Sequence, residues 1–383
     1  MTSKDRHWLC PEAVFDGATV LQDRAICVVD GVACEICAID RVPPADQQLP
    51  LRGTITPGFV DLQVNGGGNV LLNTTPTVAG MAAIAAAHRR FGTIGILPTV
   101  ITDGPEVLAA VADAALTAKG QRGLLGLHIE GPHIAVVRRG AHAENLVRTL
   151  DSTTIAIVRR LRSAGIAVMI TLAPEAASLT QIAELAGLGA IVSLGHTDAS
   201  ADDTRAALAA GATCFTHLFN AMSPMQSRSP GVVGAAINSS AYAGLICDGI
   251  HVADELLGLA IRARPVADRM FLVSDAMPTV GGLDHFDLYG QKIRLVGGRL
   301  VNAEGALAGA HVTMGQSVAR LVTALGLDLT SALRMAVTVP ARVIGRPDLA
   351  QIIGREVADL LVLDAGLAVV GSCADLGQQP KRV

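Results

Sequence analysis

The sequence has few aromatic or charged residues, no cysteine pattern typical of a disulfide framework and no long uninterrupted apolar run. Of its 383 residues, 3% are aromatic, 17% are charged and 50% are hydrophobic. Disordered chains combine low hydrophobicity with high charge, so this composition predicts a folded globular protein. The length excludes a small module and allows two or three domains, or one large α/β barrel with an attachment.

Membrane insertion and secretion are not expected either. The mean hydropathy is +0.45, but it comes from small Ala and Val residues, and no run of about 18 apolar residues occurs. The first ten residues carry Lys4, Asp5 and Arg6 with no apolar stretch after them, so no secretory signal is expected. We therefore expect a cytoplasmic protein with no membrane partner.

The charge balance and the cysteines exclude two further classes. The chain has 30 Lys and Arg against 34 Asp and Glu, so it lacks the basic excess that favours nucleic-acid binding. Its seven cysteines are an odd number scattered along the chain, which predicts reduced thiols rather than a disulfide framework. Cys34 and Cys37 have CxxC spacing, but they lie in a strand-like segment without a second pair, so we expect them to be structural.

Residues 54–345 alternate short apolar runs with Ala-rich segments of helical period, as repeated βα units do. Helices are expected from residue 78 to a stop at Gly92, and over 151–164 and 202–210, with a hairpin inserted at 281–305. Eight runs are strand candidates, which is the number in a (β/α)8 TIM-like barrel of the α/β class: 57–64, 95–99, 124–129, 166–172, 190–194, 212–216, 244–247 and 270–274.

The two ends of the chain contain further short β-like runs outside this block. They lie at residues 25–29, 35–40, 358–363 and 367–371. We therefore predict a small β-sheet domain built from residues 1–53 and 346–383, beside a catalytic barrel at 54–345.

Polar residues follow most of the predicted barrel strands. Because barrel enzymes collect their catalytic groups at the carboxyl ends of the strands, these side chains should converge on one face. In chain order they are Gln63 and Asn65, Glu130, His196, His217, Asp248 with His251, and Asp275.

A metal site is the chemistry that these residues suit best. Glu130, His196 and His217 offer one carboxylate and two imidazoles, which suit one divalent metal ion per chain with an open position for water. Zinc is the first candidate, with iron or manganese as alternatives. Asp275 could take a proton from metal-bound water and return it to a leaving group. The competing interpretation is a barrel whose polar strand ends only cap loops.

Six sequence motifs resemble one family, the N-acetylglucosamine-6-phosphate deacetylases among the metal-dependent amidohydrolases. The resemblance spans nearly the whole chain. The motifs are PGFVDLQVNG at 57–66, GLHIEGP at 126–132, SLGHT at 193–197, THLFNAM at 216–222, CDGIH at 247–251 and LVSDA at 272–276.

The resemblance implies hydrolysis of N-acetylglucosamine 6-phosphate to glucosamine 6-phosphate and acetate, in amino-sugar recycling. It implies that Glu130, His196 and His217 bind the metal and that Asp275 is the general base and acid. It also implies a homodimer. Substrate roles are implied for His142, Asn220, Ala221, Arg228, His251 and the segment Leu307, Ala308 and Gly309.

Two of these roles have a simple physical basis. The planar guanidinium of Arg228 suits a phosphate, because it donates paired hydrogen bonds, and His251 could add another donor. His142 could donate to the acetyl carbonyl and stabilise the oxyanion. Taken alone, Arg228 and His142 would be expected in solvated loops.

The sequence departs from the broader amidohydrolase pattern at the first barrel strand. Gln63 and Asn65 replace the His-x-His that would hold a second metal, and neutral amides are poor zinc ligands, so one metal is expected. Asp61 and His128 are expected as buried partners rather than catalysts. Two other functions stay open: hydrolysis of another acyl amine or a cyclic amide, which would not need the phosphate anchors, and a non-catalytic barrel that only binds.

Overall fold

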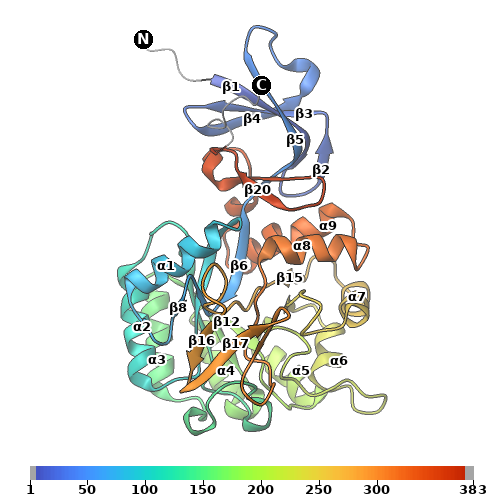
Figure 1. Ribbon diagram of the computed structural model, residues 1–383. Coiled ribbons are helices and arrows are strands. Elements are labelled where there is room, and N and C mark those ends of the chain that lie inside the picture. Colours follow the sequence, from blue (N-terminus) through green and yellow to red (C-terminus); the bar gives the residue numbers. More distant parts are fainter. Residues whose placement is uncertain (1–5, 376–383) are drawn as a thin grey trace.

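The computed structural model describes residues 6–375 as a barrel surrounded by helices, with a smaller sheet at one end (Figure 1). The eight barrel strands are parallel and each pairs with the next along the chain. They confirm the eight predicted strands. Their bounds are β6 (Phe59–Val64), β9 (Thr93–Ile101), β10 (Gly126–Glu130), β11 (Ala167–Leu172), β12 (Ile191–Leu194), β13 (Cys214–Phe215), β14 (Tyr242–Leu245) and β15 (Met270–Leu272).

The barrel closes just beyond the regular end of β15. Val64 and Ala276 form an isolated parallel bridge. The backbone N–H of Asn65 donates to the carbonyl of Ala276 over 2.9 Å, and that of Asp275 donates to the carbonyl of Gln63 over 3.0 Å. The residues that follow the first and last strands are therefore held side by side.

Helices follow the barrel strands, and the three predicted helical segments are confirmed. Thr77 and Asp151 cap the first and third helices with their side chains, as expected at helix N-termini. The helices are α1 (Val78–Arg89), α2 (Pro105–Thr117), α3 (Ser152–Ser163), α4 (Leu179–Gly187), α5 (Ala201–Ala209), α6 (Gly231–Ile237), α7 (Asp254–Arg262), α8 (Met314–Thr323), α9 (Leu329–Leu333) and α10 (Val339–Val343), with a π-helical turn at Arg334–Thr338.

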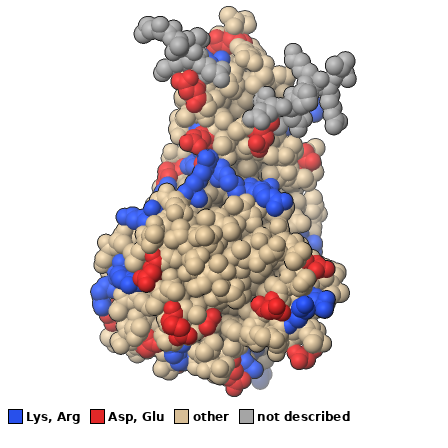
Figure 2. Space-filling model, turned by 60° about the vertical axis from the view of Figure 1, so that its left-hand side comes forward, with Lys and Arg blue, Asp and Glu red and all other residues tan. Residues whose placement is uncertain are grey.

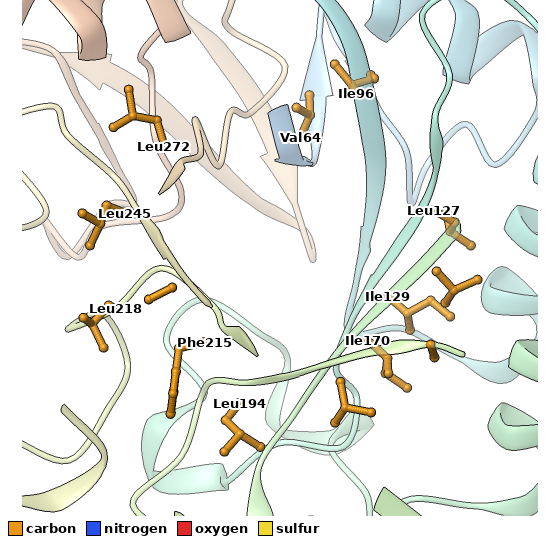
Figure 3. Close-up of a cluster of buried hydrophobic side chains, with 14 of the residues drawn as sticks. Val64, Ile96, Leu127, Ile129, Ile170, Leu194, Phe215, Leu218, Leu245 and Leu272 are labelled. Carbon is orange, nitrogen blue, oxygen red and sulfur yellow. The ribbon is translucent and has the colours of Figure 1, made fainter. Parts of the chain in front are cut away.

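The main hydrophobic core lies between the barrel strands and these helices. Apolar side chains on the outer face of the barrel, among them Ile129 and Leu194, are buried there (Figure 3). Ile84 of α1 and Leu185 of α4 belong to the same cluster. Fully burying one such side chain contributes about 1.5–3 kcal/mol. Because side chains alternate along a strand, His128 and Glu130 face the interior of the barrel instead.

Both chain ends build the small sheet, as predicted. Its strand order is β20-β19-β5-β1-β3-β4, and β2 pairs with β1. The expected boundary at residue 54 falls inside β5, which pairs with β19 through Pro57. The strands are β1 (Arg6–Phe15), β2 (Val20–Gln22), β3 (Arg24–Val29), β4 (Val32–Ala38), β5 (Gln47–Pro57), β19 (Leu360–Leu363) and β20 (Val369–Ser372).

Ion pairs join the small sheet to the barrel. Lys and Arg side chains gather at this junction (Figure 2). Arg89 at the end of α1 pairs with Asp359, and Arg122 pairs with Asp359 at 2.9 Å and with Glu356 at 3.0 Å. These arginines therefore have carboxylate partners within the chain.

The predicted hairpin at 281–305 is a three-stranded antiparallel sheet. It comprises β16 (His285–Leu288), β17 (Gln291–Val296) and β18 (Arg299–Val301). None of the helices in residues 6–375 is both long and apolar enough to cross a membrane.

Candidate metal centre and substrate cavity

Four predicted site residues meet at the carboxyl ends of the barrel strands. Glu130 is the last residue of β10, and His196, His217 and Asp275 follow β12, β13 and β15. All four are buried. The two histidines and Asp275 have positive φ angles of 49°, 27° and 50°. Non-glycine residues rarely adopt this strained conformation, and it is concentrated at functional sites.

The three predicted metal ligands point their donor atoms at one another. Oε1 of Glu130 lies 3.3 Å from Nε2 of His196 and 3.0 Å from Nε2 of His217, and the two Nε2 atoms are 3.1 Å apart. Ligands at the zinc-to-nitrogen distance of about 2.0–2.1 Å in a tetrahedral site are separated by about 3.3 Å. The group therefore fits a divalent cation.

The orientation of the His196 ring agrees with metal binding. Nδ1 of His196 lies 2.9 Å from the carbonyl oxygen of Arg138. A carbonyl only accepts, so Nδ1 carries the proton and Nε2 keeps its lone pair. Nδ1 of His217 has no hydrogen-bond partner among the described residues.

A buried layer of polar side chains lies next to the predicted ligands inside the barrel. Thr171 contacts Nε2 of His128 at 2.7 Å and the hydroxyl of Thr216 at 2.6 Å, and Thr216 also contacts Ser193 at 2.6 Å. Burial lowers the pKa of His128 to about 4. The neutral His128 therefore belongs to this supporting layer.

Gln63 and Asn65 hold carboxylates in position. Nε2 of Gln63 donates to Glu130 over 2.8 Å and to Oδ1 of Asp275 over 3.1 Å. Nδ2 of Asn65 donates to the same Oδ1 over 2.6 Å. Because their N–H groups are committed to these bonds, the two amides act as tethers between the first strand and the acidic residues.

The two carboxylates differ in their pKa. Burial favours protonation of Glu130, but the electrostatic effect of the His196 and His217 side chains beside it outweighs burial and holds the pKa of Glu130 well below its ordinary value. Burial and the nearby charge of Glu130 raise the pKa of Asp275 to about 6. Thus Glu130 stays ionised as a ligand should, while Asp275 can exchange a proton near neutral pH.

Asp61 lies deeper in the barrel than the two acidic site residues and is fully buried. It accepts hydrogen bonds from the backbone N–H groups of Gln63 and Ser274, each over 3.2 Å. Burial raises its pKa to about 7. This agrees with its expected role as a buried partner that ties the first strand to the last.

A cavity of about 180 Å³ is lined by the predicted ligands Glu130, His196 and His217. The predicted substrate residues on its walls are His142, Asn220, Ala221, His251, Leu307 and Gly309. Ala308 is buried but lines a neighbouring cavity together with Arg139 and Tyr289. Arg228 lies exposed in the loop before α6 and does not line the cavity.

His142 and His251 each have a partner at Nδ1. Nδ1 of His251 donates to Asp248 over 2.7 Å, and this partner holds the pKa of Asp248 below its usual value against the effect of burial. Nδ1 of His142 contacts the hydroxyl of Thr102 at 2.6 Å. Burial lowers the pKa of His142 to about 3, so its ring is neutral.

His142 also lies close enough to be considered as a metal ligand. Ligand atoms of Glu130, His142 and His196 all lie within 4.8 Å of one another. This spacing is wider than that among Glu130, His196 and His217, whose donor atoms lie within 3.3 Å. The tighter set therefore agrees better with one tetrahedral ion.

Sequence reasoning missed Thr102 and Tyr289, which contact the site from outside the predicted set. Thr102 follows β9, which the apolar pattern ended two residues too early at Thr99. A polar residue after the correct end of that strand was the available signal. Tyr289 lies in the turn between β16 and β17 of the inserted sheet and donates to the carbonyl of Thr102 over 2.5 Å. Its sequence neighbourhood gives no such signal.

Comparison with protein families identifies a match over most of the chain. The model of the amidohydrolase family matches residues 54–379. The chain belongs to the amidohydrolase family. The family assignment agrees with the resemblance found in the six motifs.

Individual amidohydrolases resemble this one more specifically. An N-acetylgalactosamine-6-phosphate deacetylase of Shewanella sp. (strain ANA-3) is 39% identical, over 92% of both chains. The crystal structure of N-acetylglucosamine-6-phosphate deacetylase from Pasteurella multocida has a TM-score of 0.89 and 31% identity, covering 96% of this chain and 97% of its own. The structure of a variant of N-acetyl-D-glucosamine-6-phosphate deacetylase from Mycobacterium smegmatis, in complex with N-acetyl-D-glucosamine-6-phosphate, has a TM-score of 0.85 and 34% identity. The match covers 95% of this chain and 96% of that one.

Proposed function

We propose that this amidohydrolase removes the acetyl group from N-acetylglucosamine 6-phosphate, giving glucosamine 6-phosphate and acetate. The observation that carries the proposal is one cavity that combines the cation-binding geometry of Glu130, His196 and His217 with a proton-exchanging carboxylate, Asp275. The relatives named as deacetylases of amino-sugar 6-phosphates support the substrate class.

Glu130, His196 and His217 would hold one divalent metal ion, with zinc as the first choice and iron or manganese as alternatives. When bound, such an ion polarises an acyl oxygen and lowers the pKa of water. The lowered pKa of Glu130 favours an ionised carboxylate, and the hydrogen bond at Nδ1 of His196 leaves its Nε2 with a lone pair, which are the forms that bind a metal. The side-chain amides of Gln63 and Asn65 donate hydrogen bonds to Glu130 and Asp275. They therefore act as partners of these carboxylates rather than as ligands of a second ion, which favours a single ion.

Asp275 serves as the general base and then as the general acid. Gln63 and Asn65 both donate to Oδ1, which leaves Oδ2 to take a proton from the attacking water and to deliver it to the departing nitrogen. A pKa of about 6 suits both steps near neutral pH, because the group can change its protonation state there.

His142 stabilises the negative charge that develops on the acyl oxygen. Its ring lines the cavity and is neutral, so it can act there as a hydrogen-bond donor without bringing a second positive charge. A donor that is already in place gains strength as the oxyanion forms.

His251 is the phosphate contact that the structure supports more strongly, because it lines the cavity and is oriented by Asp248. Arg228 lies exposed outside the cavity. We retain Arg228 as a phosphate contact that a second subunit could bring to the cavity, together with the predicted homodimer. The cytoplasmic location is part of the same proposal.

N-acetylgalactosamine 6-phosphate is the second candidate substrate. The relative with 39% identity carries that activity in its name, whereas relatives named N-acetylglucosamine-6-phosphate deacetylase are 30% identical in Haemophilus influenzae and 35% identical in Homo sapiens. The two sugars differ only in the orientation of the 4-hydroxyl group. Both epimers are therefore candidate substrates of this cavity.

Acetate release by metal-stripped protein titrated with zinc tests the proposal. We expect activity on N-acetylglucosamine 6-phosphate to reach its maximum at about one zinc ion per chain. Unphosphorylated N-acetylglucosamine is the control and should be a much poorer substrate. Higher kcat/KM for the galactosamine epimer would select the second candidate. No activity on either phosphate with zinc, iron or manganese would refute both.

A further inference from the structure

Thr102 lies directly after β9, is fully buried, contacts His142 and is not among the residues that line the cavity. Its Oγ1 is 2.6 Å from Nδ1 of His142. Since Nδ1 is engaged by Thr102, Nε2 is the ring nitrogen left for the cavity. A neutral imidazole carries one proton, so this contact determines whether Nε2 is a donor or an acceptor.

The surroundings of the Thr102 hydroxyl decide the direction of the hydrogen bond. Among residues 6–375, Nδ1 of His142 is the partner recorded for this hydroxyl. If Nδ1–H donated to Oγ1, the hydroxyl hydrogen would have no acceptor in a buried site, and an unsatisfied buried polar group is unfavourable. Donation from the hydroxyl to Nδ1 avoids that loss and places the ring proton on Nε2.

Two neighbouring segments hold Thr102 in place. Gly131, which follows the ligand Glu130, has a φ of 76°, and a Cβ atom there would lie 2.3 Å from Oγ1 of Thr102. A larger residue at 131 would therefore displace the hydroxyl. On the other side, the hydroxyl of Tyr289 donates to the Thr102 carbonyl over 2.5 Å. The site loop and the inserted sheet thus fix the same residue.

We propose that Thr102 is a positioning residue for the deacetylation: its hydroxyl donates to Nδ1 of His142 and keeps the ring proton on Nε2, as a donor facing the cavity. That the acceptor is the acyl oxygen rests on the proposed function, but the tautomer does not. The opposite tautomer would give Nε2 a free lone pair and turn His142 into a ligand beside Glu130 and His196.

Nitrogen NMR of the zinc-loaded protein, labelled with ¹⁵N-histidine, tests the tautomer directly. The His142→Gln variant identifies the His142 signals by their absence. We expect a protonated Nε2 and an unprotonated Nδ1 in the wild-type protein. The reverse pattern would overturn the proposal. This readout needs no turnover, so it stands apart from the activity assay that tests the proposed function.

Two substitutions then link the tautomer to catalysis. Thr102→Val keeps the shape but removes the hydroxyl, and Thr102→Ser keeps the hydroxyl. We expect Val to lower kcat about tenfold with little change in KM or zinc content, the loss typical of one hydrogen bond. Serine should retain kcat within about twofold because it restores the donor. An equal loss in both variants, or loss of zinc from the Val variant, would refute the positioning role.

Discussion

The site has a strand-held half, formed by residues at or just after barrel strands, and a loop-held half, which includes Arg228 and His251. The two halves differ in how close together their side chains lie. The donor atoms of Glu130, His196 and His217 lie within 3.3 Å of one another. In the loop-held half, His251 lines the cavity but Arg228 is exposed outside it. Barrel register fixes residues at strand ends, whereas a loop residue depends on what the loop packs against. The side chains of the predicted metal centre should therefore be held more rigidly than the predicted phosphate contacts.

Removing a strand-held ligand should have the largest effect. We expect His196→Ala to lose both the metal and measurable turnover, because a two-ligand site cannot hold the ion that the reaction needs. Zinc content after dialysis and acetate release measure the two effects. His133 is a matched control, since it is buried but contacts Thr154 and the Arg148 carbonyl instead of the ligands. A His196→Ala variant with normal zinc content would contradict the ligand assignment.

Asp275→Asn should separate chemistry from metal binding within the strand-held half. We expect kcat to fall by about 10³-fold, as when a general acid–base group is removed, while the zinc content is unchanged. The amide cannot take up a proton, but it preserves the volume near Gln63 and Asn65. Equal loss of zinc in this variant and in His196→Ala would show that Asp275 is itself a ligand.

The same contrast explains how much could be predicted from the sequence. Glu130, His196, His217 and Asp275 were predictable because each follows an apolar run, and parallel strands bring such positions together. The role of Gln63 and Asn65 as tethers was not, because hydrogen bonds across the barrel depend on how β6 and β15 meet. Thr102 was missed because the apolar pattern ended β9 too early, whereas Tyr289 was missed because its contact with Thr102 spans 187 residues of sequence.

The buried side chain of His88, which packs beside the strand-held half, should make the stability of the fold depend on pH. It is buried in α1, and its Nε2 lies 2.9 Å from the carbonyl of Gly66, next to the tether Asn65. Burial lowers the pKa of His88 to about 4, from 6.5 in an exposed group. Between these values the unfolded chain binds a proton that the folded chain excludes. Its contribution to stability is therefore complete above pH 6.5 and is lost as the pH falls toward 4.

Urea unfolding followed by circular dichroism at pH 7, 6, 5 and 4 measures this loss. The free energy of unfolding should decrease by about 3 kcal/mol from this residue over the interval, at about 1.4 kcal/mol for each pKa unit. In His88→Gln that part of the pH dependence should disappear. An unchanged slope in the variant would assign the acid sensitivity to other groups, such as His128, whose pKa is also lowered to about 4.

The smallest expected effects are those of substitutions in the loop-held half, and they test whether that half contributes to substrate binding. His251→Asn should raise KM for the phosphorylated sugar about tenfold, the loss expected for one charge-assisted hydrogen bond, with little change for the unphosphorylated sugar.

The exposed arginine of the loop-held half gives the second test. Arg228→Ala should have the same phosphate-dependent effect only where a second subunit brings Arg228 to the cavity, since the residue is exposed in its own chain. KM for Arg228→Ala should therefore be measured at protein concentrations below and above the one at which the chain dimerises, and we expect the increase in KM only above it. A concentration-independent loss would mean that the loop itself closes over the substrate, and no loss at any concentration would remove Arg228 from the site.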